Sequence, residues 1–292
     1  MKTRIAIPLA IATATLLCAC ALPAAAFDFG NLDDIKGALK KVEKVGQQVK
    51  TATGDIPQSK EIEMGGGIAS NLLGAAPLVN NAAVQKYVND VGRWLAMQTE
   101  RPDLPWQFGV LDDDDVNAFA APGGYVFITK GLLMHMHNEA ELAGVLAHEI
   151  SHVLRKHHLK AIKKGARTEL MVEFLSEATK DKGSNANLVK LANAGTQLYA
   201  RGLDKEDEFE ADRMGVVIAA RAGYDPYGLP AVLQTLETLN PKDSKLALMF
   251  KTHPALQDRL NLLSQEMGGG RFDRFQDQPD LTARFDSVMG IK

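Results

Sequence analysis

The segment His148-Glu149-Ile150-Ser151-His152 constrains the fold of this chain more than any other part of its sequence. Two histidines four residues apart lie on one face of a helix, one turn above the other, so both imidazoles can reach the same metal ion. Glu149 would lie beside the open metal position, where it could take a proton from a zinc-activated water. This H-E-x-x-H pattern therefore predicts a helix that carries a tetrahedral Zn²⁺ site.

The surrounding residues favour such a helix. A buried helical histidine is usually a hydrogen-bonded core residue, so the context has to decide between the two interpretations. Asn138 followed by Glu141 resembles a capping box, which would begin the helix. The basic residues 155–158 suit a helix C-terminus, and His148 and His152 are expected on a half-covered face beside an apolar stripe. That stripe consists of Leu142, Leu146, Ile150 and Val153.

A catalytic zinc ion that keeps one position open needs a third protein ligand. The acidic run at residues 206–212 begins a second predicted helix, over residues 206–222. Acidic residues also stabilise a helix N-terminus through the helix dipole, and this accounts for the first two acids of the run. Glu208 and Asp212 lie one turn apart on the same face. Glu208 could therefore ligate zinc while Asp212 hydrogen-bonds a ligand histidine.

Together these motifs resemble a family of zinc metallopeptidases that includes the prenyl-protein endopeptidases, the HtpX-like heat-shock proteases and the mitochondrial Oma-type proteases. The resemblance covers roughly residues 60 to 265 and is closest to the soluble branch of the family. It implies that His148, His152 and Glu208 hold one Zn²⁺ per chain, that Glu149 is the general base and that Asp212 supports the site. The matching segments are H-E-x-x-H, E-x-E-A-D at 208–212, N-A-F-A-A-P-G-G at 117–124, Gly131-Leu132-Leu133, and Thr252-His253-Pro254 with Arg259 after it.

The predicted fold class is α+β and predominantly helical, a zincin-like domain with a small β-sheet next to the active-site helix. Pro122-Gly123-Gly124 is expected to join the last two strands as a hairpin. Gly65-Gly66-Gly67 interrupts the first helical segment and indicates either a flexible joint or a close helix crossing. Strands are expected at residues 106–111, 118–120 and 125–129, and further helices at 61–98, 166–201, 227–239 and 255–263.

The chain has 292 residues, which supports one globular domain with appendages. A basic start, a short apolar run and the small-residue site Ala24-Ala25-Ala26 predict a signal peptide over residues 1–26. We expect a peripheral N-terminal helix over residues 27–58, the metallopeptidase domain over 59–267 and a polar, loosely packed C-terminal tail over 268–292.

The leader allows two destinations. Cleavage after Ala26 would give a periplasmic protein without Cys18 or Cys20, and hence without a disulfide. Alternatively, Leu17-Cys18-Ala19-Cys20 resembles a lipoprotein box, and lipidation of Cys20 would attach the protein to the outer membrane. We favour simple secretion, because a cysteine at position 18 is unusual in such a box.

Charge and hydropathy restrict the possible partners. The formal net charge is −3, and it becomes more negative without the basic leader. This balance argues against a nucleic-acid partner. After the leader, no apolar stretch is long enough to span a membrane.

The sequence therefore predicts a secreted zinc metalloendopeptidase that acts on protein or peptide substrates, such as misfolded envelope proteins. A strand edge formed by Asn117, Ala118, Phe119 and Ala120 could pair with an extended substrate, although an ordinary core strand is the alternative. The rival function is a periplasmic chaperone-like binding module whose zinc site is closed or regulatory.

His253 is the most open assignment. It precedes Pro254, which favours an extended backbone at this position. It could donate a hydrogen bond to the oxyanion of the transition state, or it could ligate zinc at rest and act as a gate. The third interpretation is a surface histidine that caps the following helix.

Overall fold

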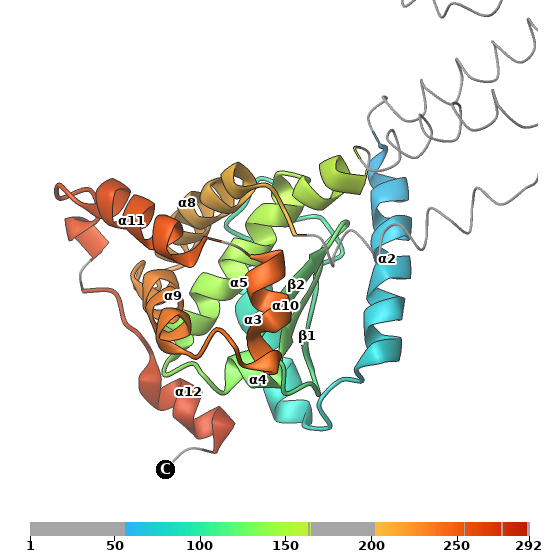
Figure 1. The fold of residues 1–292 in the computed structure, drawn as a ribbon, viewed down its shortest axis with the longest axis horizontal. Coiled ribbons are helices and arrows are strands. Elements are labelled where there is room, and N and C mark those ends of the chain that lie inside the picture. Colours follow the sequence, from blue (N-terminus) through green and yellow to red (C-terminus); the bar gives the residue numbers. More distant parts are fainter. Residues whose placement is uncertain (1–55, 163, 165–201, 254, 276, 291–292) are drawn as a thin grey trace, which may run out of the picture. The chain divides into compact units, whose positions relative to one another are not determined.

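A computed structural model describes residues 56–162, 164, 202–253, 255–275 and 277–290. This part of the chain is mainly helical with one small sheet (Figure 1), so the predicted α+β class is confirmed. The predicted signal peptide, nearly all of the predicted peripheral helix and the helical segment 166–201 lie outside the described residues. The elements are α2 Gln58–Ala75, α3 Ala82–Ala96, β1 Gln107–Leu111, β2 Ala118–Ala121, β3 Tyr125–Thr129, α4 Lys130–Leu133, α5 Glu139–Leu154, α8 Lys205–Arg221, α9 Gly228–Thr238, η1 Ser244–Leu246, α10 Ala247–Thr252, α11 Leu256–Met267, η2 Asp273–Phe275 and α12 Thr282–Met289.

The sheet has the strand order β1-β3-β2. β3 pairs in parallel with β1 and in antiparallel with β2, so β2 is an edge strand among the described residues. The predicted hairpin between β2 and β3 is confirmed. Its turn places Gly123 at φ +81° and Gly124 at φ +103°, in the left-handed region that glycine enters at little cost.

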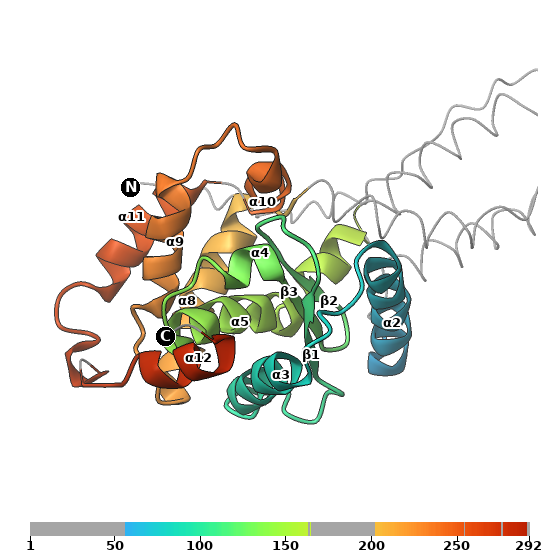
Figure 2. The same ribbon diagram turned by 90° about the horizontal axis from the view of Figure 1, so that it is seen from below.

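The two faces of the sheet pack against different helices, with α5 on one side and α2 on the other (Figure 2). Successive side chains of a strand point to opposite faces, so each strand contributes to both layers. Ala118 and Ala120 belong to the main core with α3 and α5, whereas Phe119 and Phe127 pack with Ala69 beneath α2. The main core therefore lies between the sheet and the active-site helix.

The glycines of the first helical segment do not interrupt it. α2 runs through all three, and the break in the predicted segment 61–98 comes later, between Ala75 and Ala82. A side chain at Gly65 would place its Cβ 1.6 Å from the carbonyl oxygen of Pro122, so this glycine allows α2 to contact the β2–β3 turn. Close approach, one of the two expected explanations, is the one that the structure supports.

α5 is the central helix, and every one of its residues is buried. Its predicted start is confirmed, because Asn138 Oδ1 accepts a hydrogen bond of 2.8 Å from the Glu141 amide. α8 and α9 pack along α5 at close range. A Cβ at Gly215 of α8 would lie 3.0 Å from the backbone nitrogen of His148, so this glycine lets α8 approach the ligand helix.

The C-terminal segment is not the loosely packed tail that we expected. α12 inserts Phe285, which has no exposed surface, into the main core. Arg284 pairs with the buried carboxylate of Glu139 at the start of α5, which also accepts hydrogen bonds from Tyr87 and Tyr224. Packing therefore continues beyond residue 267. No helix in the described part of the chain combines the length and the apolarity needed to cross a bilayer.

Candidate active site

α5 and α8 bring the three predicted zinc ligands together. The Nε2 atoms of His148 and His152 lie 3.0 Å apart on one face of α5. Glu208, in the first turn of α8, places its carboxylate oxygens 3.6 Å from His148 Nε2 and 3.5 Å from His152 Nε2. The two histidines were expected to be half covered, but they are 4% and 0% exposed because α8 covers them.

These residues fit a zinc ion by several independent measures. Two imidazole nitrogens and one carboxylate are the usual donor set of a catalytic zinc site. The ligand atoms of His148, His152, Glu208 and His253 all lie within 4.8 Å of one another. Glu208 Oε1 is buried and has no hydrogen-bond partner in the described residues, which is costly unless a ligand occupies it. We conclude that the donor set suits one divalent cation.

Asp212 and Arg259 support this donor set from behind. Asp212 Oδ1 lies 2.9 Å from His148 Nδ1, so a proton on Nδ1 would leave the Nε2 lone pair free for a metal. The Arg259 guanidinium donates two hydrogen bonds to Asp212, at 2.8 and 2.6 Å, and its Nη1 lies 3.2 Å from Glu208 Oε2. Arg259 is 3% exposed and therefore depends on these two carboxylates for its solvation.

The electrostatics of the site favour a cation between the ligands. Burial opposes protonation of His148, as does Arg259, but hydrogen bonds to Asp212 and Glu208 raise its pKa to about 9. Burial also opposes ionisation of Glu208, yet His253 and Arg259 hold the pKa of its carboxyl well below the usual value. Without a metal, the His148 imidazole thus tends to hold a proton beside the ionised carboxylate of Glu208. A metal ion bound at the same place would replace that proton, because both are cations attracted by these groups.

Burial also shifts the pKa values of His152 and Glu149, in opposite directions. Burial, reinforced by His148, lowers the pKa of His152 well below the usual histidine value, so its ring is neutral and can act as a ligand. Burial raises the pKa of Glu149 above that of an ordinary glutamate. A carboxylate with a raised pKa is a better proton acceptor at neutral pH than an ordinary one.

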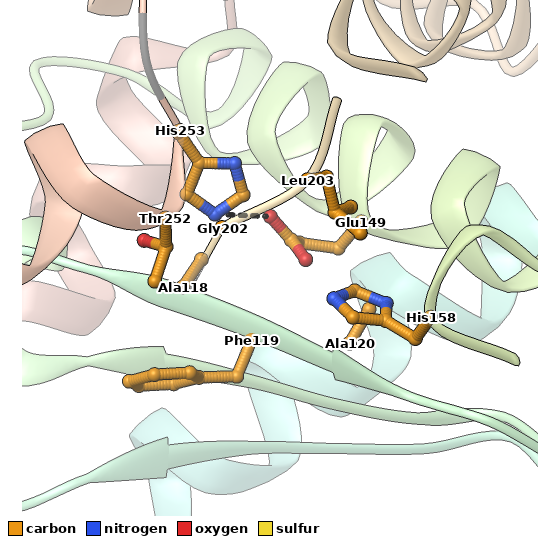
Figure 3. Close-up of a pocket in the computed structure, with 9 residues that line it drawn as sticks. All are labelled: Ala118, Phe119, Ala120, Glu149, His158, Gly202, Leu203, Thr252 and His253. Atoms are coloured by element: carbon orange, nitrogen blue, oxygen red, sulfur yellow. Dashed lines mark ion pairs between the residues drawn. The ribbon is translucent and has the colours of Figure 1, made fainter. Parts of the chain in front are cut away.

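Glu149 and His253 face each other across a small pocket (Figure 3). Glu149 Oε1 lies 3.8 Å from His253 Nε2, while Glu149 Oε2 is buried without a hydrogen-bond partner among the described residues. Strand β2 lines the pocket as well. The remaining lining residues are Ala118, Phe119, Ala120, His158, Gly202, Leu203 and Thr252.

His253 belongs to the site and does not cap a helix at the surface. Its Nδ1 lies 3.1 Å from Glu208 Oε2, and its side chain is 12% exposed. It follows α10 with φ −125° and ψ 74°, the non-helical backbone expected before a proline. α11, the next helix, begins after Ala255, and none of the described side chains caps it. The surface-cap interpretation is therefore wrong.

The predicted substrate edge lies beside the pocket, and its side chains are also part of the core. Residues of antiparallel strands alternate between hydrogen-bonded and non-hydrogen-bonded pairs. Because Thr129 donates its amide to the Asn117 carbonyl, the backbone groups of Ala118 and Ala120 point away from β3. Asn117 itself is buried, and its Oδ1 accepts a hydrogen bond from the Ala118 amide at 3.0 Å. Asn117 is thus a buried residue that holds the start of β2 in place through its side chain.

Sequence patterns did not place three residues, Arg259, His157 and His158, in the site. Arg259 was part of a motif without an assigned function, and only the folded structure brings it to Asp212. His157 and His158 were expected to be cations at a helix end, but burial lowers the pKa of both, to about 3 for His158. His158 lines the pocket, and His157 contacts His152. Their closeness in the sequence to H-E-x-x-H, within two turns of His152, was the one available signal.

Comparison with known proteins now places this site in a family. The model of peptidase family M48 matches residues 82–267, which include the sheet, α5, α8 and His253. The chain belongs to peptidase family M48. This finding confirms the resemblance inferred from the motifs.

Individual relatives agree with the family match. The beta-barrel assembly-enhancing protease of Escherichia coli K12 is 32% identical over 208 residues, 69% of this chain and 42% of that protein. Mitochondrial metalloendopeptidase OMA1 of Arabidopsis thaliana is 31% identical over 163 residues, 56% of this chain and 32% of that protein. Metalloprotease LoiP of Escherichia coli is 28% identical over 166 residues, 56% of this chain and 63% of that protein. The chain thus matches less than two thirds of the length of each.

Proposed function

We propose that this M48 protein is a zinc metalloendopeptidase, with His148, His152 and Glu208 as the zinc ligands and Glu149 as the general base. The observation that carries the proposal is the convergence of two imidazole nitrogens and a buried carboxylate oxygen, which has no hydrogen-bond partner among the described residues, beside the buried Glu149. When bound, zinc would supply Lewis-acid polarisation of the scissile carbonyl and a lowered pKa for the attacking water.

The protein's own groups would move the protons. Glu149 accepts a proton from the attacking water and later delivers it to the leaving amine. Its buried position raises its pKa, which suits a group that must take up and release a proton at neutral pH. Asp212 keeps the His148 ring oriented, and Arg259 keeps Asp212 ionised in the buried site.

The substrate would bind as an extended strand along β2. The outward carbonyl of Ala118 lies beside the pocket that holds Glu149, so a strand paired there would pass the catalytic base. Main-chain pairing tolerates many sequences, which suits a protease for unfolded proteins. The relative named as a beta-barrel assembly-enhancing protease supports envelope proteins as the substrate class.

N-methylation of a peptide substrate tests this binding mode, because a methyl group on a backbone nitrogen removes the donor that strand pairing needs. In a series of peptides that each carry one such methyl group, kcat/KM should fall at alternate positions, because only every second residue of a strand turns its N–H toward the neighbouring strand. Equal kcat/KM for all the methylated peptides and the unmethylated one would rule out β2 pairing.

His253 has two roles that its position supports. Its Nε2 faces Glu149 across the pocket, where it could donate a hydrogen bond to the oxyanion. Its Nδ1 faces Glu208, where a rotated ring could instead occupy the fourth zinc position and close the site. His253→Ala separates them: lower turnover with zinc retained supports the first role, and higher basal proteolysis supports the second.

We further propose that the protein is secreted to the periplasm by the leader at residues 1–26, and that lipidation at Cys20 is the alternative. Cell fractionation of the wild-type chain and of Cys20→Ala distinguishes the two. A membrane-associated wild-type protein that Cys20→Ala releases would establish the lipoprotein, whereas a periplasmic protein in both cases supports simple secretion.

Metal content tests the proposed zinc site. Elemental analysis should find one zinc per purified chain, and Glu208→Gln should lose it. Glu206→Gln is the matched control, because Glu206 is exposed in the same turn of α8. Cleavage of reduced casein should stop in a chelator and return with zinc. A zinc-free chain that cleaves casein would overturn the proposal, and a zinc-loaded chain that binds casein without cutting it would favour the chaperone-like alternative.

A further inference from the structure

The imidazole of His157 lies directly behind the proposed zinc ligand His152. The Nδ1 atoms of the two rings are 2.9 Å apart, their planes cross at 72°, and neither residue has exposed surface. On its other side, His157 Nε2 lies 3.2 Å from Glu210 Oε2 and 3.4 Å from Asp207 Oδ1. His157 thus connects a metal ligand on α5 to two carboxylates on α8.

A local backbone turn brings His157 to this position. α5 ends at Leu154, and Lys156 adopts the left-handed conformation with φ 57°. The next helical residues, 157–162, begin immediately after this turn, so His157 faces back toward His152. Left-handed backbone is uncommon for residues other than glycine and persists only where the surrounding structure compensates for it. The contacts of His157 provide such compensation.

The hydrogen-bond partners determine where the protons lie. A neutral His152 that offers its Nε2 lone pair to zinc must carry its proton on Nδ1. Two nitrogens 2.9 Å apart form a hydrogen bond only when one donates and the other accepts. His157 therefore accepts at Nδ1 and carries its own proton on Nε2. That proton points at Glu210 and Asp207, two acceptors that favour this tautomer.

The same geometry decides against a second metal ion at this position in the zinc-loaded protein. His157, Asp207 and Glu210 are close enough to hold a metal themselves. A metal on His157 Nε2 would place the histidine proton on Nδ1, where it would meet the Nδ1 proton of His152. Glu210 also pairs with Arg155, whose Nε lies 3.0 Å from Oε1. Because Arg155 already pairs with Glu210, that carboxylate is less available as a metal ligand. His157, Asp207 and Glu210 therefore suit a chain of hydrogen bonds that starts at His152.

We propose that His157 is a positioning residue that fixes the tautomer and ring orientation of His152 for zinc binding. The inference rests on the proposed zinc site and deepens it. α8 would support both ligand histidines: Asp212 contacts His148 directly, and Asp207 and Glu210 hold His157, which contacts His152. Loss of such an outer hydrogen bond weakens metal affinity about 10–100-fold.

Two substitutions of His157 in the full chain separate positioning from packing. His157→Leu fills the space but removes the acceptor, and it should weaken zinc affinity about 10–100-fold in competition with a chromophoric chelator. His157→Asn places an amide oxygen near the Nδ1 position, and it should recover most of that affinity. The proposal is overturned by an unchanged zinc affinity in His157→Leu, or by an equal loss in His157→Asn.

Two further measurements keep this test separate from the proposed function. The zinc content of the wild-type chain tests the metal site alone. In the zinc-loaded wild-type protein, ¹⁵N NMR of the imidazoles should show the His152 proton on Nδ1 and the His157 proton on Nε2. The opposite tautomer of His157 would overturn the positioning role even where zinc is bound, and this measurement needs no variant that might fail to fold.

Discussion

Asp212→Ala should have a large effect, because Asp212 holds together two buried groups. Its carboxylate accepts hydrogen bonds of 2.8 and 2.6 Å from Arg259 and lies 2.9 Å from His148 Nδ1. Removal of one partner of a buried ion pair costs about 3–5 kcal/mol, since the other charge stays buried. Glu208 remains 3.2 Å from Arg259 and offsets part of this cost. We therefore expect the lower end, about 3 kcal/mol of unfolding free energy.

Urea unfolding in a chelator measures this cost without the metal, and chelator competition should show a zinc affinity about 10–100-fold weaker. Asp258→Ala is the control, because Asp258 neighbours Arg259 on α11 but is 52% exposed, and its surface ion pair with Lys205 should contribute little to stability. Replacement of Arg259 by Met in the Asp212→Ala background should restore much of the stability, since it removes the uncompensated charge. If Asp212→Ala matches the wild type in both unfolding and zinc affinity, the support assigned to this pair is wrong.

Three further outcomes follow from the packing and the metal site. Gly215→Val should weaken zinc affinity and cost about 1–3 kcal/mol, because its side chain would push α8 away from the His148 backbone; equal affinity in chelator competition would contradict this. Phe285→Ala should lower the unfolding free energy by about 3–5 kcal/mol in urea, and a loss below 1 kcal/mol would mean that α12 is not part of the core. Chelation should lower the melting temperature of the wild type, and that of Glu208→Gln should respond to neither chelator nor zinc.

The clustering of the proposed zinc ligands could be predicted from the sequence because the patterns that bring them together are local. The i, i+4 spacing of His148 and His152 places them on one helix face, and E-x-E-A-D does the same for Glu208 and Asp212. The hairpin turn was equally local, since its glycines require positive φ. Strand boundaries and the Asn138 cap followed from the same short-range rules.

The misses came from interactions between distant segments. Arg259 is 47 positions from Asp212 and gains its role only when α11 packs on α8. His157 was assigned by a helix-end rule, yet the left-handed Lys156 turns it into the site. Likewise, Gly65 looked like a helix break but permits contact with Pro122, and Phe285 was hidden in a polar stretch. Local patterns do not report such tertiary contacts.

Glu149→Gln tests the central claim most directly, because it removes the proton acceptor and keeps the shape of the side chain. Turnover of reduced casein should fall about 10²–10⁴-fold, while elemental analysis still finds one zinc per chain. Glu206→Gln, exposed on α8, should keep both turnover and zinc. Near-normal casein cleavage by a zinc-loaded Glu149→Gln protein would contradict the account.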